Sequence, residues 1–210
     1  KTIVWDWNGT LFDDVSLCVE VCGRLLQSHG CKPLSGLEEY RQIFGFPVEQ
    51  FYLRMGLDFS KAPFSVLAEE YMADYQPKSD DCPLQKGAEE TLRSLWEDGY
   101  EQVLLSASRI DHLNRQLSRH AVREVFSEVL GITDIYAKSK LCLAQDWLEQ
   151  GKSGAGRILF VGDTLHDAEI ARTLGCSCIL LDRGHQSRER LEGSGFPVVS
   201  ELMEVRNLVR

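Results

Sequence analysis

The chain has 210 residues, of which 43% are hydrophobic and 26% are charged, as in an ordinary globular protein with one core and at most a modest insertion. Its formal net charge is −9, and the sequence contains no block of lysines and arginines, so we expect no nucleic-acid partner. A small anionic substrate stays compatible with this charge, because a local site can be positive on an acidic protein. We read neither a signal peptide nor a long apolar span, and therefore expect a cytoplasmic protein without membrane contact. Monomer and homodimer are both open.

The seven cysteines fall mostly within apolar patterns, and we expect free thiols in a reducing compartment. Cys18 and Cys22 share one helix face, and Cys176 and Cys178 share a strand. Neither pair has a His or Cys partner set that favours a metal site. The full set is Cys18, Cys22, Cys31, Cys82, Cys142, Cys176 and Cys178.

The first elements along the chain are a buried strand over residues 2–7 and a helix from Asp13–Asp14 to His29–Gly30, with apolar residues at helical spacing. Shorter helical stretches follow, separated by glycines and prolines. Their expected bounds are 36–44, 48–55 and 63–75. No strand pattern occurs here, so we expect residues 14–82 to form an all-α cap inserted after the first strand.

Strands and helices alternate after Pro83. Strands are expected over 102–105, 129–130, 157–161, 177–181 and 198–199. Helices are expected to begin near Ala88 and to cover 111–120, 141–148 and 165–174. Such alternation favours an α/β core with a doubly wound, Rossmann-like parallel sheet. Residues 1–13 and 83–210 would form this core.

Polar residues follow several of these strands, where ligands bind in a doubly wound sheet. Asp6 follows the first strand, Ser106 the second, and Asp163 the strand over 157–161, with Asp167 one helical turn later. Lys140 opens a helix. Carboxylates in one cleft repel each other unless a cation lies among them, and magnesium prefers oxygen ligands. We therefore predict a magnesium-dependent phosphoryl-transfer site.

These segments, in this order, resemble the four motifs of the haloacid dehalogenase superfamily, in particular its phosphoglycolate-phosphatase-like members, over nearly the whole chain. The helical stretch corresponds to the cap of those members. The matching residues are Asp6-Trp7-Asn8-Gly9-Thr10-Leu11, Ser106, Lys140 and Gly162-Asp163-Thr164-Leu165-His166-Asp167.

The resemblance implies a Mg²⁺-dependent phosphatase that hydrolyses a small phosphorylated metabolite through an aspartyl-phosphate on Asp6. Asp6, the carbonyl of Asn8 and Asp163 would bind the metal, and Asp167 would support it or bind through water. The transferring phosphoryl group would be held by Ser106 with the N–H of Ala107 and by Thr10, which would also brace the first loop. Lys140 would neutralise charge on Asp6 and on the phosphate, with Lys138 as its rival.

Asn8 departs from the family, whose phosphatases carry an aspartate there as acid and base. An amide has no titratable proton, and general acid–base assistance is typically worth about 10²–10⁴ in rate. Three explanations for the asparagine stay open. The protein could use another acid, such as His166, or a substrate with a good leaving group; the chain could be an engineered variant; or it could be a slow or inactive binding protein.

A further alternative is a metal-independent dehalogenase using the same nucleophile, which Asp163 and Asp167 disfavour. For each of several other polar and aromatic residues, we favour a structural or surface role over a role in catalysis or substrate binding. His166 is expected to be exposed and His185 to lie in a surface loop. Trp5 and Trp7 are expected to pack on the strand face opposite Asp6. Arg41 and Arg54 are expected to pair with surface acids rather than to contact substrate.

Overall fold

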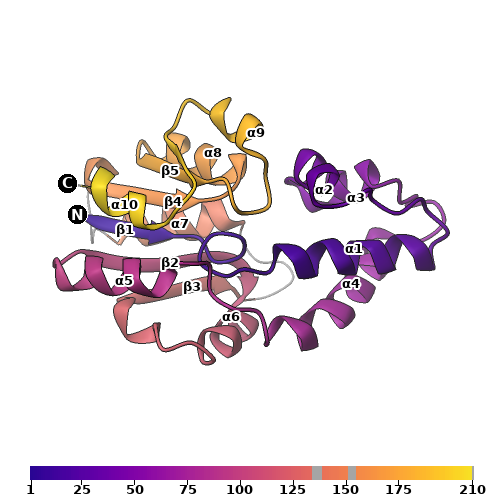
Figure 1. Cartoon of the computed structure of the whole chain (residues 1–210), viewed down its shortest axis with the longest axis horizontal. Helices are drawn as coiled ribbons and strands as arrows, with labels where there is room; N and C mark the ends of the chain where they lie inside the picture. The colour runs from indigo at the N-terminus through magenta and orange to yellow at the C-terminus, as the bar shows by residue number, and fades with distance from the viewer. Residues whose placement is uncertain (134–138, 151–154, 210) are drawn as a thin grey trace.

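A parallel sheet forms the centre of the protein, in the computed structural model that describes residues 1–133, 139–150 and 155–209 (Figure 1). Within those residues the sheet has six strands in the order β3-β2-β1-β4-β5-β6. The strands are β1 (Thr2–Trp5), β2 (Glu101–Arg109), β3 (Glu128–Ile132), β4 (Ile158–Gly162), β5 (Ser177–Leu181) and β6 (Val198–Val199). The predicted doubly wound parallel sheet is therefore confirmed.

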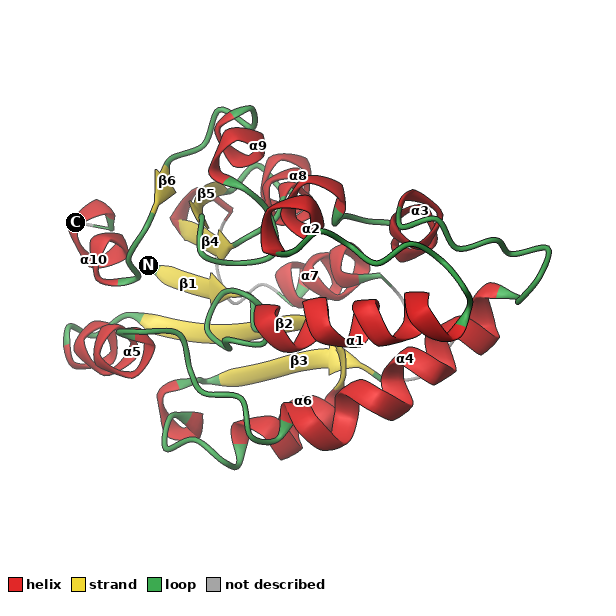
Figure 2. Ribbon diagram, turned by 45° about the vertical axis from the view of Figure 1, so that its right-hand side comes forward, coloured by secondary structure: helices red, strands yellow, loops and turns green. Residues whose placement is uncertain are grey.

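Helices cover both faces of the sheet, because alternate residues of each strand point to opposite sides (Figure 2). Ile3 and Trp5 of β1 pack in one apolar cluster with α5, α6 and α10, while Val4 packs in another with α7, α8 and α9. These helices are α5 (Ala88–Glu97), α6 (Ile110–Leu117), α7 (Lys140–Glu149), α8 (Leu165–Thr173), α9 (Arg188–Glu192) and α10 (Met203–Leu208), with single 3₁₀ turns η1 (Arg123–Val125) and η2 (Ala155–Arg157).

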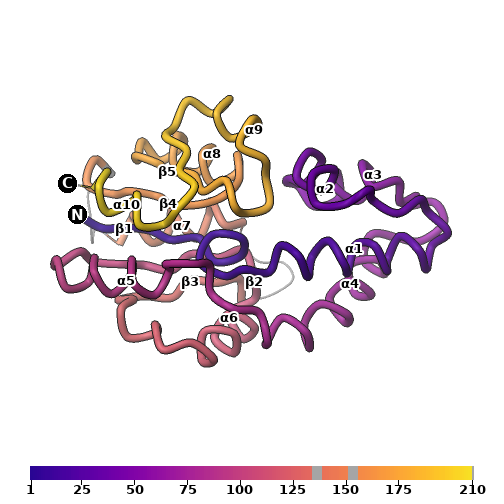
Figure 3. Tube along the Cα trace, in the orientation of Figure 1, coloured from indigo at the N-terminus to yellow at the C-terminus, as the bar shows by residue number. Residues whose placement is uncertain are grey.

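Four more helices, which we call the helical unit, lie beside the core and have an apolar core of their own. They are α1 (Val15–Ser28), α2 (Leu37–Ile43), α3 (Val48–Arg54) and α4 (Phe64–Ser79). Figure 3 shows the trace leaving the core after β1 and returning before α5, with α1 and α4 side by side. An antiparallel bridge between Phe12 and Leu84 joins the two crossing segments. An all-helical insertion was predicted here; its exact boundaries, 14–82, stay a prediction.

Asp6 lies where this topology leaves a crevice. In this strand order the connections change direction between β1 and β4, and ligands bind at such a point outside the carboxyl ends of the strands. The Asp6 N–H donates to Val161 O of β4 at 2.8 Å. Trp5 and Trp7, both 0% exposed, belong to the apolar cluster under α5 and α6. Their predicted packing role is confirmed.

Some element boundaries differ from the prediction. β1 ends at Trp5, and β2 continues to Arg109 because a register shift lets Arg109 pair with Ile132. α4 passes through Pro77, and its last turn is held by buried Ser79, whose hydroxyl donates to Gln76 O at 2.9 Å. α9 and α10 were not predicted, since such short segments show too little periodicity.

None of the helices in the described parts of the chain combines the length and the apolar character that crossing a membrane requires.

Candidate active site

Asp6 is held from two sides at the end of β1. Lys140 Nζ, from the start of α7, donates to Asp6 Oδ1, and Thr10 Oγ1 approaches Asp6 Oδ2 at 3.1 Å. The Asp6 side chain is 12% exposed. Burial raises the pKa of Asp6, against the neighbouring Lys140 ammonium, which lowers it. The carboxylate therefore faces the crevice in a fixed orientation, as a nucleophile must.

Asp163 fits closely between two glycine-containing loops. Its Oδ2 accepts the His185 N–H at 2.6 Å. A Cβ on Gly9, which has φ +75°, would come within 2.3 Å of this oxygen, and one on Gly184 within 2.1 Å. Only glycine lets both backbones approach this carboxylate so closely. Burial, together with the charges of Asp6 and Asp167, raises the pKa of Asp163 to about 8, against the opposing influence of His185.

Asp167 and Lys140 form the remaining charged pair. Lys140 Nζ donates to Asp167 Oδ1 at 2.5 Å, while Asp167 Oδ2 accepts from the Thr164 hydroxyl at 2.7 Å and the Thr164 N–H at 3.1 Å. Thr164 and Asp167 thereby form a capping box at the start of α8. Burial acts to raise the pKa of Asp167, but Lys140 outweighs it and the pKa is lowered. Burial acts to lower the pKa of Lys140, but its two carboxylate partners raise it.

The donor atoms suit a divalent cation. Oxygens of Asp6, Asp163 and Asp167 lie within 4.8 Å of one another. When ionised, these three carboxylates exceed the single ammonium of Lys140 by two negative charges. An all-oxygen set with that excess matches Mg²⁺, which takes carboxylate ligands and keeps waters and phosphate oxygens in its shell. Coordination by the Asn8 carbonyl stays a prediction.

Ser106, Ala107 and Thr10 were the predicted phosphate contacts. Ser106 and Ala107 line the same cavity as Asp6, and Ser106 Oγ accepts the Ser108 N–H at 3.0 Å. Thr10 is fully buried, and its hydroxyl also lies 2.9 Å from Asp163 Oδ1. Thr10 therefore braces two carboxylates, while phosphate binding by any of the three stays a prediction.

The Asn8 side chain connects the core to the helical unit. Its Nδ2 donates to Asp14 Oδ2 at 2.9 Å and lies 3.0 Å from the Tyr75 hydroxyl, and its Oδ1 accepts from Ser108 Oγ at 2.8 Å. Asp14 precedes α1 and Tyr75 belongs to α4. The amide thus has partners for both of its polar atoms and acts as a structural bridge.

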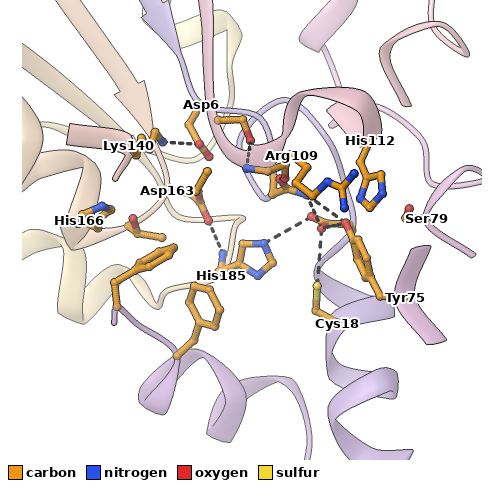
Figure 4. Close-up of a pocket in the computed structure, with 18 of the residues that line it drawn as sticks. Asp6, Cys18, Tyr75, Ser79, Arg109, His112, Lys140, Asp163, His166 and His185 are labelled. Carbon is orange, nitrogen blue, oxygen red and sulfur yellow. Dashed lines mark hydrogen bonds and ion pairs between the residues drawn. The ribbon is translucent and has the colours of Figure 1, made fainter. Parts of the chain in front are cut away.

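His185 was predicted in a surface loop, and this prediction is wrong. It is 4% exposed, its Nε2 lies 3.4 Å from Asp14 Oδ1, and its Nδ1 lies 2.9 Å from the Tyr40 hydroxyl (Figure 4). Burial acts to lower the pKa of His185, but Asp14 raises it to about 9. The pKa of Asp14 is lowered because bonds to His185, Tyr75 and Asn8 outweigh its burial. The sequence held no signal for this pair, since its members lie at opposite ends of the chain.

Cys18 also has partners that the sequence did not reveal. Its Sγ lies 3.6 Å from Asp14 Oδ2, and Asp14, Cys18 and His185 place ligand-type atoms within 4.8 Å of one another. The expectation that no cysteine has such partners is therefore wrong for Cys18. All seven cysteines are free; Cys18, Cys22, Cys176 and Cys178 are buried, and Cys31, Cys82 and Cys142 are half-buried.

The two arginines of the helical unit lie away from the carboxylates. Arg41 donates to Gly184 O at 2.9 Å and Arg183 O at 2.7 Å, and so ties α2 to the loop after β5, with a 3.8 Å ion pair to Glu38. Arg54 donates to Ile43 O at 2.7 Å. Neither lines the Asp6 cavity.

His166 is half-buried on the wall of the Asp6 cavity, with its ring 4.7 Å from that of Phe46. His166 was expected to be exposed and is exposed only in part, and its catalytic role stays untested. Lys138, the rival of Lys140, lies outside the described residues.

The model of the haloacid dehalogenase-like hydrolase family matches residues 3–181. Phosphoglycolate phosphatases of Vibrio parahaemolyticus and Aliivibrio fischeri are 28% and 29% identical over 219 and 226 residues, covering 98% and 100% of this chain and 95% and 98% of theirs.

Solved structures share the fold. A haloacid dehalogenase-like family hydrolase from Streptococcus pneumoniae aligns with a TM-score of 0.84 at 17% identity, covering 100% of this chain and 98% of that one. A protein described as a predicted phosphatase from Clostridium acetobutylicum aligns with a TM-score of 0.84 at 19% identity, covering 100% and 97%. At such identities these matches establish the architecture alone.

Proposed function

The chain belongs to the haloacid dehalogenase-like hydrolase family, and on this premise we propose that it is a Mg²⁺-dependent phosphatase of small phosphate monoesters. The observation that carries the proposal is the convergence of Asp6, Asp163 and Asp167 on one crevice, with Lys140 bonded to Asp6. The full-length relatives named phosphoglycolate phosphatase support the same reaction type. The cytoplasmic location stays a prediction.

The reaction would proceed in two displacements. A carboxylate oxygen of Asp6 forms a bond to phosphorus while the bond from phosphorus to the leaving oxygen breaks, giving an aspartyl-phosphate. Water then attacks that phosphorus, releases inorganic phosphate and restores the Asp6 carboxylate. Lys140 would stabilise the charge of both reacting groups, and Ser106, which lines the cavity, would hold a phosphoryl oxygen.

Mg²⁺ would be held by Asp6 and Asp163 and would neutralise phosphoryl oxygens. Asp167, whose oxygens accept from Lys140 and Thr164, would support this metal site or bind the metal through water.

A phosphate-release assay tests this function. The wild type and Asp6→Asn are compared on phosphate monoesters that include 2-phosphoglycolate, with Mg²⁺ and with a chelator. Asp81→Asn is the matched control, because Asp81 is an exposed aspartate outside the cavity. Release that depends on Mg²⁺ and on Asp6 supports the phosphatase, and release that persists in Asp6→Asn refutes it.

An idle binding protein is the second candidate, since Asn8 cannot donate a proton. Tight ligand binding without turnover on any ester would favour it. Halide release from a haloacid, unaffected by a chelator, would instead indicate a dehalogenase.

A further inference from the structure

The cavity beside Asp6 is much larger than a phosphoryl group needs. Its volume is about 390 Å³, whereas about 150 Å³ is enough to hold benzene. The walls that the helical unit contributes carry aromatic rings: Tyr40, Phe44, Phe46, Tyr71 and Tyr75.

Two cations on the described part of the wall beyond Lys140 already have carboxylate partners. Arg109 pairs with Asp111 at 2.6 Å, and His185 pairs with Asp14 at 3.4 Å. The His185 pair is buried, whereas the Arg109 pair is exposed. A second acidic group on a substrate would therefore compete with Asp111 for Arg109 in contact with solvent.

The described wall of the helical unit presents mainly aromatic rings to the cavity and thus favours a leaving group without charge.

Phe46 lies where a substrate ring could stack. It is a cavity-lining residue in the loop between α2 and α3, yet 39% of its surface is exposed. Its ring lies 4.7 Å from His166 and 5.8 Å from Phe44. An exposed aromatic ring adjoining two other rings offers a face to a third, because offset and edge-to-face ring pairs attract.

Asn8 adds an independent constraint on the leaving group. It cannot supply a proton, so unless His166 acts as the acid the leaving oxygen must depart as an anion or take its proton from water. A phenol has a pKa of about 10, whereas an alkoxide is nearly as basic as hydroxide, whose parent water has a pKa of about 15.7. A phenolate therefore needs far less help from a general acid.

Building on the phosphatase function above, we propose that the substrates of this site are aryl phosphates, monoesters whose leaving group is an uncharged aromatic alcohol. An Asp6 oxygen bonds to phosphorus, and the phosphorus–oxygen bond breaks with its electron pair moving to the phenolate. The phenolate then takes a proton from water, and a second water releases phosphate from Asp6. The ring occupies the aromatic part of the cavity, against Phe46.

Three probes separate ring recognition from leaving-group basicity. Phenyl phosphate has a ring and a weakly basic leaving group, benzyl phosphate has a ring and an alkoxide, and 2-phosphoglycolate has an alkoxide and no ring. We expect the single-turnover rate of alcohol release, which reports the first displacement, to be about 100-fold or more higher for phenyl phosphate than for benzyl phosphate. The two ring substrates should share a similar Kd, below that of 2-phosphoglycolate.

Phe46→Ala should raise KM for both ring substrates roughly two- to tenfold and leave KM for 2-phosphoglycolate unchanged. Trp96→Ala is the control, because Trp96 is 53% exposed on α5 and lies outside this cavity. Asp6-dependent turnover that is fastest on 2-phosphoglycolate, or unaffected by Phe46→Ala, would overturn the substrate class and leave the phosphatase standing. Absence of Asp6-dependent release from all three probes would overturn both.

Discussion

Replacing Asn8 by aspartate should turn this site into a faster phosphatase for alkyl esters. The new carboxyl would stand where Asn8 Nδ2 now donates to Asp14 Oδ2 at 2.9 Å. Asp14 is ion-paired to His185 and accepts the Gly9 N–H at 3.0 Å, so Asp14 keeps its charge. The proton shared by the two carboxyls should therefore reside on the new one.

The separation of the two carboxyls sets the magnitude. Two negative charges 2.9 Å apart repel by about 6 kcal/mol at an effective dielectric constant of about 20. This repulsion corresponds to about four pKa units, which moves the new carboxyl from about 3.9 to about 8. It would be protonated at pH 7, the form that a general acid needs. Since the new carboxyl must take up a proton on folding at pH 7, about three units above its unfolded pKa of about 3.9, we expect the variant to lose about 4 kcal/mol of unfolding free energy at this pH.

The assay is single-turnover release of the alcohol from benzyl phosphate and phenyl phosphate at pH 7, which reports the first displacement. Asn8→Asp should raise this rate by up to about 10²–10⁴ for benzyl phosphate, and much less for phenyl phosphate. Asn8→Ser, which adds no acid, is the matched control. Equal rates of alcohol release by Asn8→Asp and Asn8→Ser from benzyl phosphate would refute the reasoning.

Three other predictions follow from the charged groups. Asp6→Asn should lower phosphate release by at least about 1,000-fold, measured at saturating substrate. His185→Gln leaves the buried Asp14 without its cation and should lower the free energy of unfolding by about 3–5 kcal/mol in denaturant titrations at pH 6. The pKa of His185 is raised to about 9 in the folded protein from an unfolded-state pKa near 6.5. The stabilisation that protonated His185 provides is therefore complete below pH 6.5 and is lost as the pH rises through 9. The difference in unfolding free energy between wild type and His185→Gln should narrow over that range. Mg²⁺ at a fixed concentration of about 100 times its Kd at pH 8.5 should add about 2.7 kcal/mol in thermal denaturation at that pH. The same concentration should add less at pH 5, because Asp163, with a pKa of about 8, must lose its proton to bind the metal.

A matched variant serves as the control for each of these three predictions. Asp81→Asn should keep full activity. His29→Gln removes the ion pair of His29 with Glu70, whose side chains are 24% and 43% exposed, and should lower the free energy of unfolding by less than about 1 kcal/mol. If His185→Gln costs no more than His29→Gln, Asp14 does not depend on His185. Asp163→Asn should abolish the Mg²⁺ shift, and a shift of unchanged size would place the metal elsewhere.

The sequence predicted the centre of the site because it depends on strand ends. Asp6, Ser106 and Asp163 lie in or after buried strands, and parallel strands bring such residues to one edge of the sheet. Lys140 was found only through its position before a helix. For these residues local pattern and topology were sufficient.

The sequence could not predict the partners that cross between the core and the helical unit. His185 lies in a polar loop, and nothing local indicates that Asp14 and Tyr40 bury it. Likewise, the bond from Asn8 to Asp14 depends on how α1 approaches the first loop. Phe46 stands between a glycine and a proline, outside any periodic pattern, so its position on the cavity wall needed the tertiary structure.

The most direct measurement of the central claim is detection of a phosphoryl group on Asp6. The wild type is mixed with phenyl phosphate and Mg²⁺, quenched in acid and analysed by peptide mass spectrometry. Without a general base at Asn8 to activate water, the aspartyl-phosphate should accumulate on the peptide that contains Asp6, and it should be absent from Asp6→Asn and from chelated samples. Phosphate release without any adduct on Asp6, or an adduct on another residue, would contradict the account.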